Sequence, residues 1–458
     1  MVNKVLDGIL GLCVADACGV PVEFSLRSER KQKPVKGMTG YGTYYKPPGT
    51  WSDDSSMTLA TMHSLCQGLD YEDLMKHFKD WYEDGKYTAD QEVFDIGNVT
   101  RKAIRAYDGK KKAYECGLFR ESDNGNGSLM RILPFAFYLK STFTDGIYLT
   151  EEGFDIVHKA SCITHAHPIS QIACGIYVSI AMVLCDAQPG ISIQEAVRAA
   201  FRFYRNKKGY IGWIERFSRI EDLSELALTT ENDIRSSSYV VDTLEAALWC
   251  FLTTDGYEDC VLKAVNLGED TDTVAAVAGG LAGLKYGAKA IPQEWKAVLA
   301  RRNDIEELCR TFHARCLRRD VQRFSTFLLY FEEKKGRDLC VWKGAEPVTS
   351  DVYQFSYPAY DAQVYELMEN VLPHSMFVDP DYQKTLKERG YETLEEAMEN
   401  LSQADLEMVM AMFTAISRRE RSEHGYWNAV FKSGKLYLLV KRLFRLVNPV
   451  PIVRTFYE

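Results

Sequence analysis

The 458-residue sequence lacks an uninterrupted run of about 20 apolar residues, the length that crosses a membrane. Its apolar N-terminal stretch, residues 5–20, is broken by Asp7 and Asp16, which argues against a signal peptide. We therefore expect a soluble protein with no membrane partner. An excess of basic residues is also lacking. The sequence has 55 basic and 64 acidic residues, which gives a formal net charge of −9. This balance argues against a nucleic-acid partner, other than as a modified substrate.

Cysteine pairs of the zinc-binding type are absent as well. Twelve cysteines are scattered along the sequence, and no two have CxxC spacing. Several lie in apolar runs, where free cysteine behaves as a small buried hydrophobe. The simplest interpretation is a reducing compartment, and we expect a cytoplasmic protein.

Period-2 strand patterns are scarce in residues 1–318, where helical periodicity dominates. In residues 240–254, apolar side chains recur at three- and four-residue spacing, which is typical of one helix face. The apolar fraction of 46% allows a sizeable core. We therefore predict an all-α fold for this region. The expected helices include residues 5–17, 55–69, 71–85, 169–187, 192–206 and 240–254.

The pattern changes after this region. Residues 332–361 are rich in turn residues and aromatics, and two helical stretches follow at 391–423 and 433–447. We predict a compact multi-helix domain over residues 1–335 and a smaller, mainly helical domain of unknown function over residues 336–458. Basic residues in the second domain indicate a solvated face, and a role in docking a target is a hypothesis.

The segment GTWSDDS (residues 49–55) is the first with chemical potential. Asp53 and Asp54 are adjacent carboxylates flanked by hydroxyls, and an apolar helix follows. Taken alone, the pattern can be a simple helix start. Serine and aspartate are preferred N-caps, and acidic side chains suit the positive end of a helix.

The segment LGEDTDT (residues 267–273) opens another predicted helix. It has three carboxylates and two hydroxyls in five residues, more than a helix cap can use. Massed like charge is costly unless a cation neutralises it. Together, the two segments predict one composite site of hard oxygen ligands, which suit Mg²⁺ or Mn²⁺ better than zinc. Two such ions can hold an attacking water and polarise a substrate hydroxyl.

Three further segments have weaker patterns. Glu23 follows the N-terminal helix and, taken alone, could be any exposed acid. The amides of residues 124–128 (NGNGS) could cradle phosphate oxygens, although Asn-Gly is also a plain turn sequence. His165 and His167 precede a helix and could ligate a metal, bind a sugar or cap the helix.

These segments together resemble the ADP-ribosylglycohydrolase family, whose founding members reactivate ADP-ribosylated dinitrogenase reductase. The resemblance covers roughly residues 3 to 315, in the order typical of the family, and the DDS and DTDT combination is specific. The matching text is GLCVADACGVPVEF, GTWSDDSSMTLA, DIGNVTRKAI, NGNGSLMRILPFAF, ITHAHP and NLGEDTDTVAAVAGGLAGLKYG. The resemblance implies a compact all-α domain with two divalent cations, Mg²⁺ or Mn²⁺, in a central cleft.

The resemblance also implies which residues hold the metals. The family often has threonine where this chain has Ser52 and Ser55, so the hydroxyl is retained. The implied ligands are Ser52, Asp53 and Asp54 from one side, and Asp270, Asp272 and Thr273 from the other.

The same resemblance implies roles in substrate binding. Glu23 falls where some members carry an acidic residue that assists catalysis, and His165 matches a histidine near the ribose and phosphate. Asn124 stands where some members have an aromatic that stacks on adenine, so no stacking residue is assigned. The residues expected along the diphosphate are Asn126, Gly127 and Ser128.

The implied reaction is hydrolysis at the anomeric C1″, which releases ADP-ribose from a protein side chain or a small conjugate. A carboxylate or a metal-delivered hydroxide would activate water, and the transition state would have oxocarbenium character. The sequence leaves open whether the acceptor linkage is to arginine, serine, an acyl group or a nucleobase. The residues expected to carry catalysis are Glu23, Asp53, Asp54 and Asp272.

Two other functions remain open at this point. The chain could bind ADP-ribose without cleaving it. Alternatively, residues 270–274 (DTDTV) fit the nucleophile pattern of haloacid-dehalogenase-like phosphatases. That pattern should follow a buried strand in a doubly wound α/β domain, whereas KAVNLGE precedes it and a Gly/Ala-rich helix follows.

Overall fold

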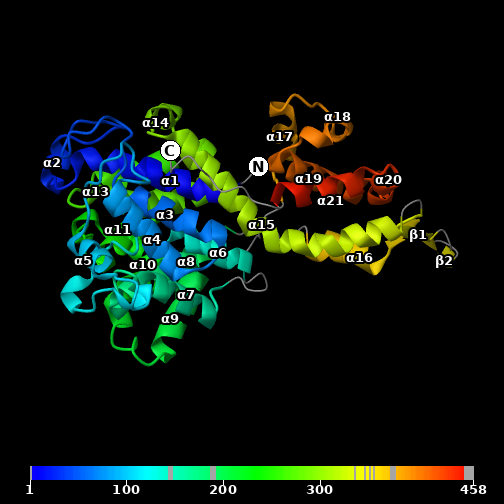
Figure 1. The fold of residues 1–458 in the computed structure, drawn as a ribbon. Helices are drawn as coiled ribbons and strands as arrows, with labels where there is room; N and C mark the ends of the chain where they lie inside the picture. The colour runs from blue at the N-terminus through cyan, green and yellow to red at the C-terminus, as the bar shows by residue number, and fades with distance from the viewer. Residues whose placement is uncertain are drawn as a thin grey trace. The chain divides into compact units, whose positions relative to one another are not determined.

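The computed structural model describes residues 3–142, 148–185, 192–334, 337–344, 347–349, 352–353, 356–371 and 378–447. The chain forms two compact units, a larger one from Lys4–Phe312 and a smaller one mainly from His313 onward. Helices are the main elements of both units, which confirms the predicted all-α fold with a mainly helical C-terminal part (Figure 1).

The larger unit is built from helices joined by loops and short 3₁₀ turns. Its expected helices are all present, although residues 186–187 of the predicted 169–187 helix lie outside the described residues. The helices are α1 (Lys4–Gly19), α2 (Arg27–Gln32), α3 (Asp53–Gln67), α4 (Tyr71–Asp84), α5 (Asn98–Ala106), α6 (Leu133–Thr142), α7 (Glu151–Cys162), α8 (Pro168–Leu184), α9 (Ile193–Asn206), α10 (Leu223–Leu228), α11 (Val240–Leu252), α12 (Tyr257–Val265), α13 (Thr271–Tyr286), α14 (Gln293–Val298) and the first part of α15 (Arg302–Glu333).

The centre of the larger unit is the pair α1 and α13. Glycines allow the two backbones to touch: a Cβ on Gly11 would lie 2.6 Å from the carbonyl oxygen of Gly279. At the C-terminal end of α1, a Cβ on Gly19 would lie 2.3 Å from the Cα of Asp272. Close glycine packing therefore brings the end of α1 against the start of α13, where the DTDT segment lies.

Helix α1 and the 3₁₀ turn after it, together Lys4–Val22, are long and apolar enough to cross a membrane by length and composition alone. In the structure, most of this segment is buried inside the protein. Asp7 and Asp16 are buried within it, and each accepts hydrogen bonds from backbone amides. The segment therefore has the environment of a core helix.

The smaller unit combines short strands with helices. Strands β1 (Cys340–Lys343) and β4 (Tyr357–Tyr360) pair antiparallel, with Cys340 opposite Tyr360, and β2 (Pro347–Thr349) pairs with β3 (Val352–Tyr353). The predicted 391–423 stretch is divided into two helices. The helices of this unit are α16 (Ala362–Tyr365), a π-helical turn (Glu366–Val371), α17 (Tyr382–Glu388), α18 (Leu394–Glu399), α19 (Leu406–Ser422), α20 (Tyr426–Lys432) and α21 (Lys435–Val447).

Helix α15 explains where the sequence pattern changes. This single helix continues to Glu333, and the predicted boundary near residue 335 lies just after its end. The compact units divide inside the helix, between Phe312 and His313. Helical periodicity continues across this division, so the sequence pattern changes only where the helix stops.

The environment of the DTDT segment excludes the phosphatase alternative. Helix α12 precedes the segment and α13 follows it. In the described part of the chain, the strands all lie in the smaller unit and form two-stranded antiparallel pairs. The buried parallel strand that the alternative needs is therefore absent from the described residues before Asp270.

Candidate active site

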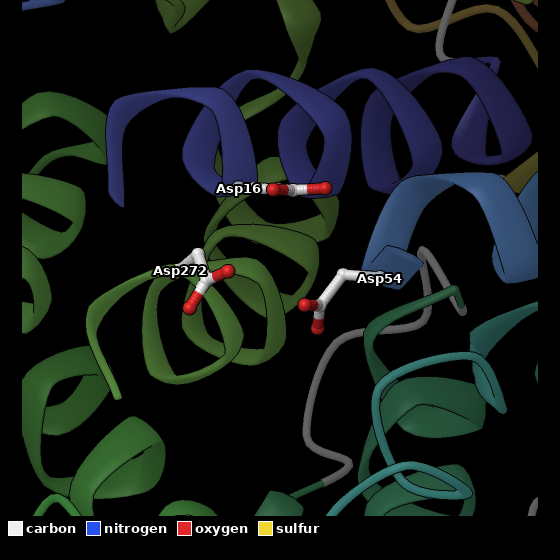
Figure 2. A group of neighbouring side chains, drawn as sticks. All are labelled: Asp16, Asp54 and Asp272. Atoms are coloured by element: carbon white, nitrogen blue, oxygen red, sulfur yellow. The ribbon is translucent and has the colours of Figure 1, made fainter. Parts of the chain in front are cut away.

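Three helices bring carboxylates together in the larger unit. Asp16 lies near the end of α1, Asp54 in the first turn of α3 and Asp272 in the first turn of α13 (Figure 2). All three are buried, and each offers a carboxylate oxygen within 4.8 Å of those of the other two. The structure thus joins the DDS and DTDT segments in one composite site, as the sequence predicts.

The start of α3 is both a helix cap and a part of this site. Ser52 is the N-cap, and its hydroxyl accepts a hydrogen bond from the Asp54 amide at 3.3 Å. The same hydroxyl donates to Asp54 Oδ2 at 3.0 Å. Thr273 from α13 donates to this oxygen as well, at 3.2 Å. One oxygen of Asp54 is thereby fixed, and the carboxylate has a defined orientation.

Asp16 is a residue of this site that was not predicted, since in the sequence it only interrupts an apolar run. Its carboxylate accepts hydrogen bonds from the backbone amides of Ser52 and Ser55, each at 3.0 Å, and from the Ser55 hydroxyl at 2.5 Å. Asp16 therefore holds the DDS turn in place. An acid inside an apolar helix is a usable signal, because a buried charge needs partners.

The start of α13 positions the other half of the site. Asp272 Oδ1 accepts a hydrogen bond from the Thr273 amide at 2.9 Å. Asp270 precedes the helix, and its Oδ2 accepts a hydrogen bond from Asn126 at 3.1 Å. Thr271 points away from the carboxylates and donates to the carbonyl of Gly19 at 2.8 Å.

Glu23 and Asp95 form a second group with Asp272. One oxygen from each of the three lies within 4.8 Å of the others. Tyr44 donates to Asp95 at 2.6 Å, and Asp95 is partly exposed whereas Glu23 is buried. Asp95 and Tyr44 were not predicted as site residues, although Asp95 opens the DIGNVTRKAI segment that resembles the family. Solvent therefore reaches this acidic group at Asp95.

Each of four carboxylates keeps one oxygen buried and without a hydrogen-bond partner among the described residues. The unsatisfied oxygens are Glu23 Oε2, Asp54 Oδ1, Asp270 Oδ1 and Asp272 Oδ2. Buried acceptors without donors are rare, since each costs the free energy of its lost hydration. Hard oxygens left free in this way are the donor set that divalent cations take. The residues present therefore fit a divalent-cation site.

Burial and mutual repulsion raise the pKa values of these acids. Desolvation is the main cause, and it raises the pKa of Asp270 from 3.8 to about 6. Burial first, then repulsion by Asp95 and Asp270, raises the pKa of Glu23 from 4.5 to about 10. The pKa values of Asp53 and Asp272 are also raised well above 3.8, mainly by burial. Ionising the whole group therefore requires compensating positive charge.

The NGNGS loop lies beside the carboxylates. Asn126 connects the two, because its side-chain amide donates to Asp270 and, at 3.0 Å, to the hydroxyl of Thr243. Gly127 has no space for a side chain, since a Cβ would lie 2.9 Å from Cε1 of His165. Buried Arg131 donates to the Gly127 carbonyl. The loop backbone is therefore held rigidly.

His165 and Ser128 lie at this loop, but they face different ways. The Nδ1 atom of buried His165 is 2.7 Å from the Thr164 hydroxyl, and burial lowers the pKa of the imidazole to about 3, so the ring is neutral. The Ser128 hydroxyl accepts a hydrogen bond from Ser161 at 2.9 Å and is fully buried. The side chain of Ser128 is thus used inside the protein, which leaves its backbone as the group that could face a ligand.

The comparisons with known proteins agree on one family. The family model of the ADP-ribosylglycohydrolases matches residues 1–321, which is more than half of the chain. The chain belongs to the ADP-ribosylglycohydrolase family. Residues 316–449 match a separate family of unknown function, DUF6508.

Similar proteins support this membership. An ADP-ribosylarginine hydrolase Tri1 from Pseudomonas putida is 32% identical over 308 residues, covering 67% of this chain and 76% of the relative. The ADP-ribosyl-[dinitrogen reductase] glycohydrolase of Rhodospirillum rubrum is 30% identical, covering 65% of this chain and 90% of the relative. A solved ADP-ribosylglycohydrolase-related protein complex aligns with a TM-score of 0.53 at 29% identity, covering 67% of this chain and 95% of that one.

Membership assigns the general chemistry of the larger unit. The protein is an ADP-ribosylglycohydrolase, a hydrolase that acts on glycosidic bonds of ADP-ribose. Its acidic groups agree with the divalent-metal dependence of the family. The comparisons give no support to a non-catalytic binding module or a phosphatase.

Proposed function

We propose that this ADP-ribosylglycohydrolase cleaves the N-glycosidic bond between C1″ of ADP-ribose and an arginine side chain of a protein. The names of two relatives, an arginine hydrolase and a dinitrogen reductase glycohydrolase, support a protein acceptor. The acidic mouth formed by Glu23 and Asp95 supports a cationic leaving group, because the Asp95 carboxyl is partly exposed to solvent there. The observation that carries the proposal is the set of four buried, unsatisfied carboxylate oxygens at the meeting point of α1, α3 and α13.

The proposed cofactors are two divalent cations, Mg²⁺ or Mn²⁺. Their ligands would come from the two helix starts, with Asp16 as a positioning residue because hydrogen bonds already occupy its oxygens. When bound, such cations neutralise the carboxylates, orient ribose hydroxyls and lower the pKa of a water. The proposed ligands are Ser52, Asp53, Asp54, Asp270, Asp272 and Thr273.

The chain's own acids would manage the proton and the developing positive charge. Glu23 has a raised pKa, so it can hold a proton and deliver it to the departing nitrogen as the C1″–N bond breaks. Asp95, oriented by Tyr44, lies beside it and can stabilise the positive charge that grows on the sugar ring. Water then forms the new bond to C1″ and gives up a proton to the Glu23 carboxylate, so that free ADP-ribose and unmodified arginine result.

The NGNGS loop would receive the diphosphate. Asn126 and Gly127 present rigid backbone next to neutral His165, which can donate or accept a hydrogen bond without adding charge. An aromatic group lies beside His165, where Leu118 pairs with the His165 backbone. The Phe119 ring is 5.6 Å from that of His167, and the His167 ring is 4.7 Å from that of Trp213. Phe119 is largely exposed. We propose Phe119, supported by this group, as the surface on which adenine stacks.

Two synthetic peptides test the acceptor assignment. One carries ADP-ribose on arginine and the other carries it on serine, and mass spectrometry follows release of free ADP-ribose by the full-length protein. The acidic mouth predicts that the arginine peptide releases ADP-ribose about 5- to 150-fold faster than the serine peptide, because one misplaced polar group costs about 1–3 kcal/mol. Equal rates, or a preference for serine, would overturn the arginine assignment.

Two predictions about context remain proposals. We propose that the protein works in a reducing cytoplasm, and the support is that its twelve cysteines are all free and, except for partly exposed Cys162, buried. Docking of a target by the C-terminal unit also stays a prediction, because the family that it matches has no known function.

A further inference from the structure

Three exposed aromatic side chains lie next to Glu23 and Tyr44 in the sequence. Phe24 is 67% exposed, Tyr41 61% and Tyr45 81%, which makes them unusual among large hydrophobic residues of the larger unit. Single exposed apolar residues are ordinary, but a group of them rimmed by polar residues marks a contact surface. We call Phe24, Tyr41 and Tyr45 the aromatic rim.

The backbone holds each rim residue in an uncommon conformation. The φ angles are 63° for Phe24, 59° for Tyr41 and 58° for Tyr45, all in the left-handed region that bulky residues rarely adopt. Strain of this kind persists only where the surroundings over-determine it, and it is concentrated at functional sites. Burial offsets little of the strain here: the Phe24 ring lies 6.4 Å from that of Tyr44 and the Tyr41 ring 6.0 Å from that of Tyr45, but all three rim side chains are largely exposed.

The loop that carries Tyr41 and Tyr45 is fixed to the acidic site. The Thr43 amide donates to the Pro21 carbonyl at 3.0 Å, and the Thr43 hydroxyl donates to the Glu23 carbonyl at 2.8 Å. Gly42 lies so close to Pro21 that a Cβ would clash with its carbonyl oxygen. Within the same turn, Tyr44 points inward to Asp95 while its neighbour Tyr45 points outward. The rim and the acidic mouth are therefore parts of one rigid structure.

The geometry limits what the rim can contact. In the proposed function, ADP-ribose extends inward to the buried carboxylates and the NGNGS loop, so the acceptor must lie on the solvent side of Glu23 and Asp95. We place the rim on that side, because its residues are exposed and its loop is hydrogen-bonded to the Glu23 carbonyl. Lys46, the cation next to Tyr45, is paired with Asp90 at 2.7 Å and Glu92 at 2.6 Å, so it does not repel a cationic acceptor.

From these contacts we infer that the aromatic rim docks the folded acceptor protein, by packing on the apolar surface and arginine side chains around the modified residue. Aromatic faces suit both partners, because they bury apolar area and attract guanidinium groups. This inference rests on the proposed function and adds to it a surface that distinguishes a whole protein from a small conjugate.

The test compares two substrates of different size. One is free ADP-ribosyl-arginine, and the other is serum albumin that has been ADP-ribosylated on arginine. The variant carries Tyr41→Ser and Tyr45→Ser together. We expect KM for the modified albumin to rise about tenfold or more, as for the loss of two aromatic contacts in an interface, with kcat unchanged. For free ADP-ribosyl-arginine, both constants should stay within about twofold of the wild type.

Matched variants separate docking from structural damage. Tyr41→Phe with Tyr45→Phe keeps the rings and should retain the wild-type KM, and Leu228→Ser removes another exposed apolar side chain, at the end of α10, without effect. Equal losses on both substrates, or no loss on either, would overturn the inference. If the wild type cleaves neither substrate, the proposed function itself fails, so the two failures are distinguishable.

Discussion

Replacing Asp272 with asparagine is expected to lower kcat/KM for ADP-ribose release by about 1,000-fold, the scale for removing one preorganised charged group. Asp272 is the carboxylate shared by the two acidic groups, one with Asp16 and Asp54 and one with Glu23 and Asp95. Its Oδ2 is buried and has no partner among the described residues. The variant keeps the shape of the side chain, and steady-state kinetics on the arginine-linked peptide measure the loss.

The same variant should not unfold the protein. Asp272 is surrounded by like charges, and burial and repulsion raise its pKa, so the neutral amide relieves repulsion in the metal-free state. We therefore expect its metal-free Tm to equal or exceed that of the wild type. The matched control is Asp259→Asn, which changes an exposed aspartate in the first turn of α12. Wild-type activity in Asp272→Asn would show that the carboxylate group does not carry the reaction.

The stability of the metal-free protein is expected to fall as the pH rises from 5 to 8. The folded-state pKa values of Asp16 and Asp270 are raised from 3.8 to about 6, chiefly by burial. The folded protein therefore binds more protons than the unfolded chain in this range, and the stability that those protons provide is lost as the pH passes the raised pKa. A rise of this size corresponds to a loss of about 3 kcal/mol in the free energy of unfolding per group. The loss is complete once the group is ionised in both the folded and the unfolded protein.

Divalent cations should reverse this dependence. They bind the ionised carboxylates in the folded state only, so added Mn²⁺ should raise Tm by several degrees at pH 8 and by much less at pH 5. Differential scanning calorimetry with EDTA or excess Mn²⁺ measures both curves. In Asp272→Asn the effect of Mn²⁺ should be much smaller. An increase in Tm of the EDTA-treated wild type from pH 5 to pH 8 would contradict the assignment of the raised pKa values.

The sequence was informative where chemistry and helix starts coincide. The DDS and DTDT segments were predicted to open helices, and α3 begins at Asp53 and α13 at Thr271. Their excess of carboxylates over the needs of a cap indicated that the two segments share a site. The glycines of α1 and α13, which allow backbone contact, are the physical reason that segments so far apart in the sequence meet.

Asp16, Tyr44 and Asp95 were not assigned as site residues from the sequence, although Asp16 and Asp95 lie in segments that resemble the family. Asp16 lies in an apolar helix, and its role depends on how the end of α1 packs against the turn before α3, 36 residues away. Tyr44 and Asp95 are in separate loops, and their hydrogen bond spans 51 residues. No periodicity predicts such contacts, because a loop's path follows from what it packs against.

The smaller unit shows another limit of pattern analysis. Its strands have only two to four residues each, too short for alternation to be visible in the sequence. The division of the compact units inside α15 is equally hidden, because one uninterrupted helix contributes to both. Helix periodicity indicates which residues are buried locally, but it does not indicate to which compact unit a given turn of the helix belongs.

The most direct test of the central claim is removal and return of the metal. Full-length protein is stripped with EDTA and desalted, and release of ADP-ribose from the arginine-linked peptide is then measured by mass spectrometry before and after adding Mg²⁺ or Mn²⁺. If the carboxylates of α3 and α13 hold catalytic cations, the stripped protein is inactive and either or both ions restore release. Full activity of the stripped protein would contradict the account, because the four unsatisfied oxygens would then have no part in catalysis.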